Sequence, residues 1–215
     1  MIASRMSRSN REIPHYYLQR DVDVGALTAR LAHENESRPI EDRILVAAAF
    51  VRATARAAAR HPELNGHWVD DRFRPAPAVN VAVAISLRTG GLLTPYIEHA
   101  DERSLEETMA MLQEFTLAAR SGSLRSEWTR GEASITVTNL GERGADLVHG
   151  VISPPEVALV GFGRVIDRPW VVDGEIVVRP IVTITLAADH RATDGAVGSR
   201  FLATLAKTLE HPEEL

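Results

Sequence analysis

The sequence of 215 residues contains no cysteine, which excludes a disulfide framework, a thiolate nucleophile and a cysteine-ligated zinc site. Lys207 is the only lysine among 24 basic residues, so Schiff-base and P-loop lysine chemistry is excluded from the rest of the chain. No apolar run approaches the roughly 18 residues of a membrane-spanning helix. The basic first residues are not followed by the apolar stretch of a signal peptide. We therefore expect a cytoplasmic protein with no membrane partner.

The chain also lacks a concentration of positive charge. Its net charge is −5 and its arginines are spread along the sequence, so we expect no nucleic-acid partner. Hydrophobic residues make up 45% of the chain, which is enough for a substantial core. Because no linker or internal repeat divides the sequence, we predict one domain over residues 1–215.

Alternating and helical periodicities predict strands and helices in turn along the chain. We expect strands at residues 15–24, 79–85, 134–138, 156–165 and 170–186, and helices at residues 40–60, 104–119 and 196–210. Ser104 and Glu107 form a capping box before the middle helix, and Asp173 with Gly174 predicts a hairpin turn. Because several late strands follow one another directly, we predict an α/β fold in which helices pack on a mixed sheet.

The most informative segment is residues 189–195 (DHRATDG), between an apolar strand and the last expected helix. A histidine at the end of a buried strand is well placed to act as a base at neutral pH. The same histidine could instead be a structural residue of the core. Asp189, His190 and Asp194 could also be metal ligands, but no second cluster completes a ligand set and Asp194 could cap the helix. We therefore predict no metal site.

Six segments, in this order, carry a resemblance to a known family. They are residues 13–18 (IPHYYL), 61–68 (HPELNGHW), 90–95 (GGLLTP), 135–141 (ITVTNLG), 154–158 (PPEVA) and 189–195. Together they resemble the catalytic domain of the dihydrolipoamide acyltransferases of 2-oxo acid dehydrogenase complexes. That resemblance implies the fold of the chloramphenicol acetyltransferase-like superfamily, and it covers nearly the whole chain.

The resemblance implies acyl transfer between coenzyme A and a second nucleophile. His190 would remove the proton from the attacking group, and Thr138 would donate a hydrogen bond to the tetrahedral oxyanion. Asp194 would hold the active-site loop in place. Arg5, Asn139 and Gly141 are the residues that we expect to contact coenzyme A. The family places its active sites between the subunits of a trimer, so we expect His190 and Thr138 to meet across the interface of a homotrimer.

The chain also departs from the family pattern at both ends. It begins almost where the catalytic domain begins, with no lipoyl-lysine hairpin and no covalent lipoyl group of its own. It ends without the apolar tail that links trimers into cages, so we expect a discrete trimer. These departures slightly favour a free-standing enzyme that acetylates a small-molecule hydroxyl, as in tetronate biosynthesis. One alternative is a dihydrolipoyl acyltransferase core, either excised or using lipoyl groups in trans, and a second is a non-catalytic trimeric scaffold.

Overall fold

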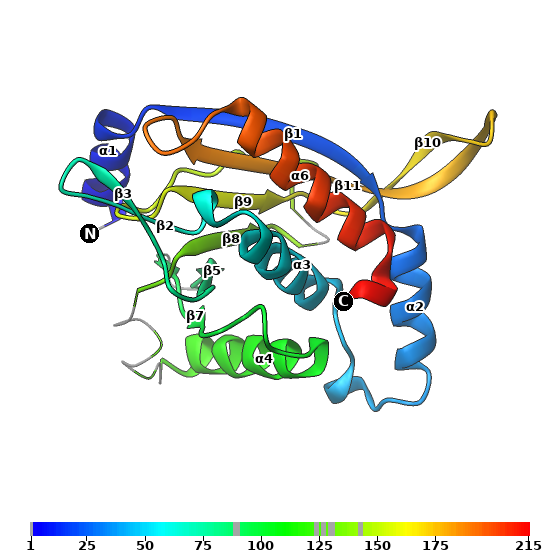
Figure 1. The fold of residues 1–215 in the computed structure, drawn as a ribbon. Helices are drawn as coiled ribbons and strands as arrows, with labels where there is room; N and C mark the ends of the chain where they lie inside the picture. The colour runs from blue at the N-terminus through cyan, green and yellow to red at the C-terminus, as the bar shows by residue number, and fades with distance from the viewer. Residues whose placement is uncertain (1, 88–90, 123–124, 126–127, 129–131, 142–143) are drawn as a thin grey trace.

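A computed structural model gives the fold (Figure 1). It describes residues 2–87, 91–122, 125, 128, 132–141 and 144–215. Gly90 of the expected segment 90–95 lies outside the described part, which also leaves out the side chain of Arg5.

A seven-stranded sheet joins segments from both halves of the sequence. Its order is β1-β11-β9-β8-β4-β7, and β10 pairs with β11 outside this path. The strands are β1 (His15–Asp23), β4 (Val81–Val83), β7 (Tyr96–Ile97), β8 (Ile135–Asn139), β9 (Ala158–Phe162), β10 (Ile166–Val172) and β11 (Glu175–Asp189). The central strands β9, β8 and β4 are parallel to one another, whereas the outer pairings are antiparallel. The predicted mixed sheet is therefore confirmed.

Four helices cover one face of this sheet. They are α2 (Gly25–Asn35), α3 (Val46–Arg60), α4 (Leu105–Ser121) and α6 (Gly195–Glu210), and Figure 1 shows α3 and α6 in front of the strands. In the second half of β11, every second residue from Val182 to Ala188 points into the core between the sheet and the helices. Phe50 of α3 stacks on Phe162 of β9 with 4.3 Å between ring centroids. Burial of these side chains fixes which face of the sheet the helices cover.

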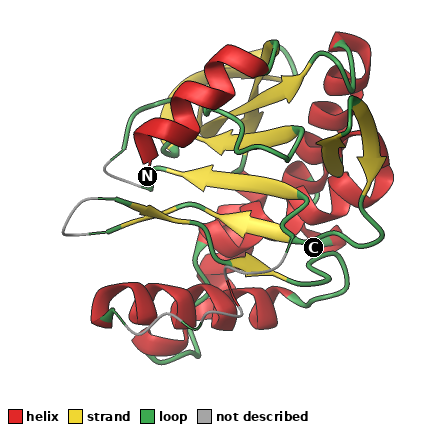
Figure 2. Cartoon of the chain, turned by 90° about the vertical axis from the view of Figure 1, so that its left-hand side faces the viewer, coloured by secondary structure: helices red, strands yellow, loops and turns green. Residues whose placement is uncertain are grey.

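The remaining elements are short and lie around the sheet. Helix α1 (Ile2–Glu12) packs at one end of the strands, on the side that Figure 2 turns toward the reader. Two small sheets pair β2 (Gly66–Val69) with β3 (Arg72–Pro75) and β5 (Ile85–Ser86) with β6 (Leu92–Leu93). Three 3₁₀ turns complete the chain: η1 (Ile40–Asp42), η2 (Pro62–Leu64) and η3 (Pro212–Glu214).

The structure corrects several expected element boundaries. The predicted helix at residues 40–60 begins only at Val46, because the backbone of Leu45 is extended and a 3₁₀ turn precedes it. Helices α1 and α2 were not expected at all. The capping box of Ser104 and Glu107 is present as predicted.

Strands β10 and β11 form the predicted hairpin, which projects beyond the helices as a twisted ribbon (Figure 1). Asp173 and Gly174 both have positive φ, 52° and 86°, as the tight turn requires. None of the described helices is long and apolar enough to cross a membrane.

Candidate active site

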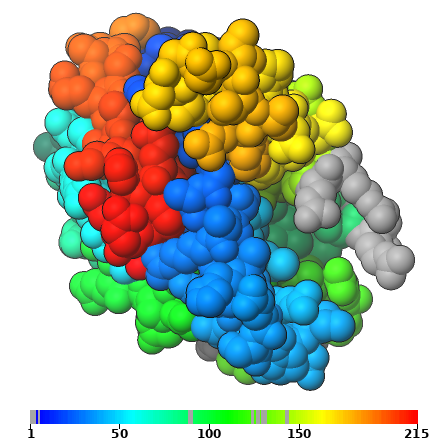
Figure 3. All heavy atoms as spheres, turned by 90° about the vertical axis from the view of Figure 1, so that its right-hand side faces the viewer, coloured from blue at the N-terminus to red at the C-terminus, as the bar shows by residue number. Residues whose placement is uncertain are grey.

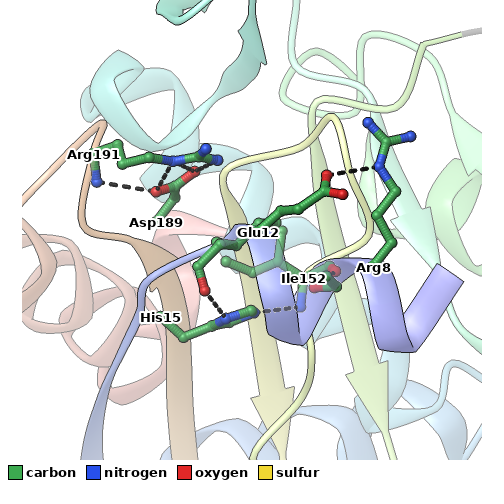
Figure 4. Close-up of polar contacts among 8 residues, drawn as sticks. Arg8, Glu12, His15, Ile152, Asp189 and Arg191 are labelled. Atoms are coloured by element: carbon green, nitrogen blue, oxygen red, sulfur yellow. Dashed lines mark hydrogen bonds and ion pairs between the residues drawn. The ribbon is translucent and has the colours of Figure 1, made fainter.

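Asp189 ends the longest strand of the sheet and anchors the segment that follows it. The carboxylate is fully buried and accepts hydrogen bonds from Arg191 Nη2 at 2.6 Å and from Arg191 Nε at 3.0 Å (Figure 4). The backbone N–H of Arg191 donates to the same carboxylate at 2.9 Å. The guanidinium also lies over the ring of Trp68, 4.7 Å from its centroid. The ion pair with Arg191 neutralises the buried charge of Asp189. The hydrogen bonds to Asp189 in turn raise the pKa of Arg191 above its ordinary value.

Backbone hydrogen bonds hold the turn that carries His190. The N–H of His190 donates to the carbonyl of Pro14 at 3.0 Å, just before β1. The N–H groups of Ala192 and Thr193 both donate to the carbonyl of Asp189. The polypeptide of the turn is therefore fixed against β1 and β11, while the side chain of His190 is exposed.

Asp194 closes the turn as the N-cap of α6. Its carboxylate accepts hydrogen bonds from the N–H groups of Ala196 and Val197, at 2.9 and 3.0 Å. The bonds from Val197 and Ala196 are the main causes that lower the pKa of Asp194, with smaller contributions from the charges of Arg200 and His190. Asp194 is therefore the N-cap of α6, and its role in holding the active-site loop stays a prediction.

The residues that we considered as metal ligands are separated by these contacts. Asp189 is occupied by Arg191 and Asp194 caps α6, and neither carboxylate is hydrogen-bonded to the imidazole of His190 among the described residues. Within the described residues, no group of three or more histidine, cysteine, aspartate or glutamate side chains could hold a metal ion.

His15 lies beside this segment but is held in place by two backbone groups. The N–H of Ile152 donates to Nε2 at 3.1 Å, so Nε2 is the acceptor nitrogen (Figure 4). Nδ1 is then protonated and donates to the carbonyl of Ile13 at 2.9 Å. Both ring nitrogens of His15 are engaged by the backbone, so His15 is not available as a base.

The sequence did not single out Tyr16, which contacts the ring of His190. The two ring centroids are 5.0 Å apart and the ring planes meet at 59°. Tyr16 belongs to one of the family-like segments, but no spacing or composition marked it as part of the site.

Thr138 lies near the other end of the strands, on the face that the helices leave uncovered. It pairs with Gly161 of β9, and Gly161 pairs with Thr185 of β11. Thr185 precedes Asp189 by four residues, or about 13 Å of strand, and two strand spacings of about 4.8 Å separate β8 from β11. A single chain therefore does not bring Thr138 and His190 to one substrate carbonyl. Among the described residues, the Thr138 hydroxyl has no hydrogen-bond partner.

A groove of about 1000 Å³ opens at the end of β8 that carries Thr138. It lies on the side of the molecule seen in Figure 3, between α2 in blue and the strand ends in yellow. Its lining is mainly apolar and comes from α2, from the start of α3 and from the segments after β8 and β9: Thr28, Leu31, Ala32, Ile44, Leu45, Val46, Ala47, Phe50, Asn139, Leu140, Gly141, Gly163, Arg164 and Val165.

Two of the three residues expected to contact coenzyme A belong to this groove. Asn139 Oδ1 accepts a hydrogen bond from the N–H of Gly141 at 2.9 Å, which shapes the rim of the groove. Gly141 has a φ of 67°, a conformation that glycine adopts without strain. The backbone of Arg5 lies in α1 at the His190 end, away from the groove, and its side chain is outside the described part. The prediction for Arg5 therefore stays untested.

Comparison with known proteins gives the family. The model of the 2-oxoacid dehydrogenases acyltransferase (catalytic domain) family matches residues 1–215. The chain belongs to this family. The resemblance that the six sequence segments indicated is thereby confirmed, and with it the acyltransferase class.

Two curated relatives show which members of the family the chain is similar to. The dihydrolipoyllysine-residue acetyltransferase component of the pyruvate dehydrogenase complex of Zymomonas mobilis is 32% identical over 99% of the chain and 48% of its own length. The lipoamide acyltransferase component of the branched-chain alpha-keto acid dehydrogenase complex of Pseudomonas aeruginosa is 35% identical over 100% of the chain and 50% of its own length. The chain spans about half the length of these relatives.

These relatives correct one of our expectations. The comparisons give no support to a free-standing enzyme that acetylates a small-molecule hydroxyl, because the matched proteins are lipoamide acyltransferases of dehydrogenase complexes. They support the alternative, a dihydrolipoyl acyltransferase core. The departures from the family pattern at the two ends of the sequence were therefore a poor guide to the acyl acceptor.

Solved structures agree with the predicted fold. The Azotobacter vinelandii dihydrolipoamide acetyltransferase superimposes with a TM-score of 0.90 at 25% identity, over 98% of this chain and 87% of that one. A chloramphenicol acetyltransferase, at 14% identity and over 97% of this chain and 92% of that one, gives a TM-score of 0.60 and shows the shared fold alone. The fold is therefore chloramphenicol acetyltransferase-like, as expected.

Proposed function

We propose that this chain transfers an acyl group between coenzyme A and a dihydrolipoyl thiol, with His190 as the general base. One observation carries the assignment of residues. In the Azotobacter vinelandii enzyme, a serine, a histidine and an asparagine have been studied for their role in the catalytic mechanism, and they are separated by 52 and 4 residues. Thr138, His190 and Asp194 have the same residue types or close analogues at the same separations.

The separation of Thr138 and His190 within one chain supports an active site between subunits. A base and an oxyanion donor must both lie about 3 Å from the reacting groups. Because about 13 Å of strand separates their positions along the sheet, His190 of one subunit would work with Thr138 of the partner subunit. We propose a homotrimer in which each chain contributes both residues, to two different sites.

The proposed reaction exchanges one thioester for another. The imidazole of His190 takes the proton from the attacking thiol, and the resulting thiolate adds to the carbonyl carbon of the thioester. The carbonyl oxygen becomes an oxyanion that accepts a hydrogen bond from the Thr138 hydroxyl, which no other described group engages. Collapse of the tetrahedral intermediate breaks the original carbon–sulfur bond, and the departing thiolate takes the proton back from His190.

The groove beside Thr138 is the proposed site of coenzyme A. Its volume of about 1000 Å³ is at the upper end of the range of small-molecule sites. Its apolar walls suit the pantetheine arm, and Asn139 and Arg164 are the polar groups at its rim. Asn139, the residue after Thr138, lines the groove, so an arm that leaves the groove past the end of β8 would bring its thiol to Thr138 on the other face of the sheet.

The acyl acceptor is assigned from the relatives. Both curated relatives described above carry lipoyl-dependent names, and they differ in the dehydrogenase complex that each belongs to. We therefore propose a dihydrolipoyl group carried outside residues 1–215 as the thiol partner. Since strands from residue 15 to residue 189 share one sheet, we also propose that residues 1–215 form one catalytic domain.

The test is an assay of acyl transfer with purified protein. Incubation with acetyl-CoA and dihydrolipoamide should release free coenzyme A and form acetyl-dihydrolipoamide, whereas hydroxyl acceptors at the same concentration should not react. His190→Ala should lower kcat by about 10²–10⁴-fold, the range for loss of a general base. Equal turnover by His190→Ala would contradict the proposed mechanism, and preference for a hydroxyl acceptor would contradict the proposed acceptor.

A further inference from the structure

No carboxylate is hydrogen-bonded to the imidazole of His190 among the described residues, although His190 contributes to the lowered pKa of Asp194. Asp189 is engaged by Arg191, and Asp194 by the first N–H groups of α6. Within the described residues, no hydrogen bond to either ring nitrogen of His190 is present, although its backbone N–H is bound to Pro14. The side chain that contacts the imidazole ring is Tyr16, with ring centroids 5.0 Å apart. An aromatic residue therefore stands where many catalytic histidines have a carboxylate.

Tyr16 is itself fixed from two sides. Its hydroxyl shares a hydrogen bond of 2.9 Å with the hydroxyl of Thr193, which is buried in the same turn as His190. Its ring lies against α6 at Gly198, where an added Cβ would come within 3.0 Å of the Tyr16 hydroxyl oxygen. Burial raises the pKa of Tyr16, so the hydroxyl stays protonated and available for this bond at neutral pH.

The contacts of Tyr16 connect three elements. Its backbone pairs with Ala188 of β11, its hydroxyl reaches the turn at Thr193, and its ring touches His190. A change in the position of Tyr16 would therefore alter the direction of the imidazole without breaking the backbone hydrogen bonds of the turn.

We propose that Tyr16 is a positioning residue for His190. The hydrogen bond to Thr193 holds the ring of Tyr16 in its working orientation. The proposal rests on the acyl-transfer function proposed above. The ring of Tyr16 restricts rotation of the imidazole, so that its free nitrogen faces the thiol delivered by the partner subunit. Because proton transfer depends steeply on geometry, loss of this restriction should lower kcat more than it changes KM.

The first experiment measures kcat and KM for a set of matched variants. Tyr16→Phe and Thr193→Val each remove one side of the hydroxyl pair and should each lower kcat by about fivefold, the worth of a hydrogen bond near 1 kcal/mol. The double variant should be no slower than either single variant, because both remove the same interaction. Thr193→Ser should retain activity, and Tyr16→Leu should lose about 10²-fold. KM for acetyl-CoA should stay within about twofold of the wild-type value in every case.

Tyr96→Phe is the matched control for these substitutions. The Tyr96 hydroxyl donates to Glu98 at 3.1 Å on β7, at the far edge of the sheet, so its loss removes a comparable bond away from the site. Its kcat should equal that of the wild type. Additive losses in the double variant, or an unchanged kcat in Tyr16→Phe, would overturn the proposal.

The second experiment reads the position of the ring without any reaction. In protein labelled with ¹³C-histidine, the Cε1–H signal of His190 is assigned by its absence from His190→Ala. The ring of Tyr16 should displace this signal from the position of free histidine, and Tyr16→Leu should abolish the displacement. Tyr16→Phe and Thr193→Val should move the signal alike, and Tyr96→Phe should not. An unmoved signal in all variants would overturn the proposal even if the proposed acyl transfer is confirmed. A wild-type chain without acyl transfer would refute the proposed function alone.

Discussion

The two ends of the sheet differ in how their polar groups are used. At the end that carries His190, the carboxylates of Asp189 and Asp194 and the backbone N–H groups of residues 190–193 have partners within the chain. At the end that carries Thr138, the strands open into an apolar groove and the threonine hydroxyl has no partner among the described residues. The polar groups around the His190 imidazole are thus held within the chain, whereas the Thr138 end is open to a ligand.

This difference matches the two tasks that we assign to the ends. A base must have a fixed direction, because proton transfer falls off within a fraction of an ångström, and the hydrogen-bonded turn provides that direction. An oxyanion donor must keep its hydroxyl free until the intermediate forms, and an unengaged Thr138 does so. Each end lacks what the other supplies, as our proposal of a site built from two copies of the chain requires.

The largest expected effect comes from dividing the two ends between different subunits. Thr138→Ala alone should lower kcat by about 10²–10³-fold, as for other single oxyanion donors. When Thr138→Ala and His190→Ala chains are expressed together with different tags and purified as mixed trimers, about one site in three should hold both intact residues. Activity should then return to roughly a third of the wild-type value. Mixed trimers that are no more active than either single variant would place both residues in one chain.

The next effect concerns the buried charge at the His190 end. Arg191→Met leaves the fully buried carboxylate of Asp189 without its partner and should lower the free energy of unfolding by about 3 kcal/mol. Arg164→Met is the matched control at the other end, because the pair of Arg164 with Asp146 is exposed and should cost less than about 1 kcal/mol. Urea denaturation followed by tryptophan fluorescence measures both. Equal losses of unfolding free energy in the two variants would mean that the buried ion pair at the His190 end stabilises the chain no more than the exposed pair at the other end.

A smaller effect is expected from narrowing the groove at the Thr138 end. Ala47 lies in the first turn of α3 and lines the groove, so Ala47→Phe should raise KM for acetyl-CoA by about tenfold with little change in kcat. Ala59→Phe places the same ring on an exposed position of the same helix and should leave both constants unchanged. A KM for acetyl-CoA that does not respond to Ala47→Phe would exclude the groove as the coenzyme A site.

The smallest effect concerns the cap of α6. Asp194→Asn retains an oxygen that accepts the N–H groups of Ala196 and Val197, so activity at neutral pH should change little. The lowered pKa of Asp194 means that its carboxylate stabilises the folded chain above the unfolded value, near 3.8, and loses this contribution as the pH falls through the lowered pKa. The Tm difference between wild type and Asp194→Asn should therefore be constant above about pH 5 and shrink below pH 3.8. A constant difference down to pH 2 would show that Asp194 carries no such charge contribution.

Periodicity predicted the parts of the fold that depend on local sequence. The alternation in β1, the capping box at Ser104 and the turn at Asp173 and Gly174 are all present as expected. Helix α1 was missed because one of its contacts with the rest of the chain is made by a buried serine: Ser9 donates to the carbonyl of Ile152 at 2.6 Å. Because this contact is made by a polar residue with a partner far along the chain, it leaves no apolar periodicity in the sequence of α1.

The candidate site was predicted in its residues but not in its geometry. Ordered motifs indicated His190, Thr138 and Asp194, whereas the distance between His190 and Thr138 required the register of β8, β9 and β11. The groove was not foreseen, because α2 begins at Gly25 without a side-chain cap and buries only Leu27 and Leu31. Tyr16 was not identified, since contact with His190 depends on the pairing of β1 with β11.

The pairing of β1 with β11 has a further consequence for how the molecule is made. His15 lies opposite Asp189, so β1 is synthesised long before the segment of β11 with which it pairs. A nascent chain carries β1 without this neighbour while the residues between them are made, and contacts between such distant segments form slowly. The turn that carries His190 therefore reaches its place against Pro14 only after both strands have been made.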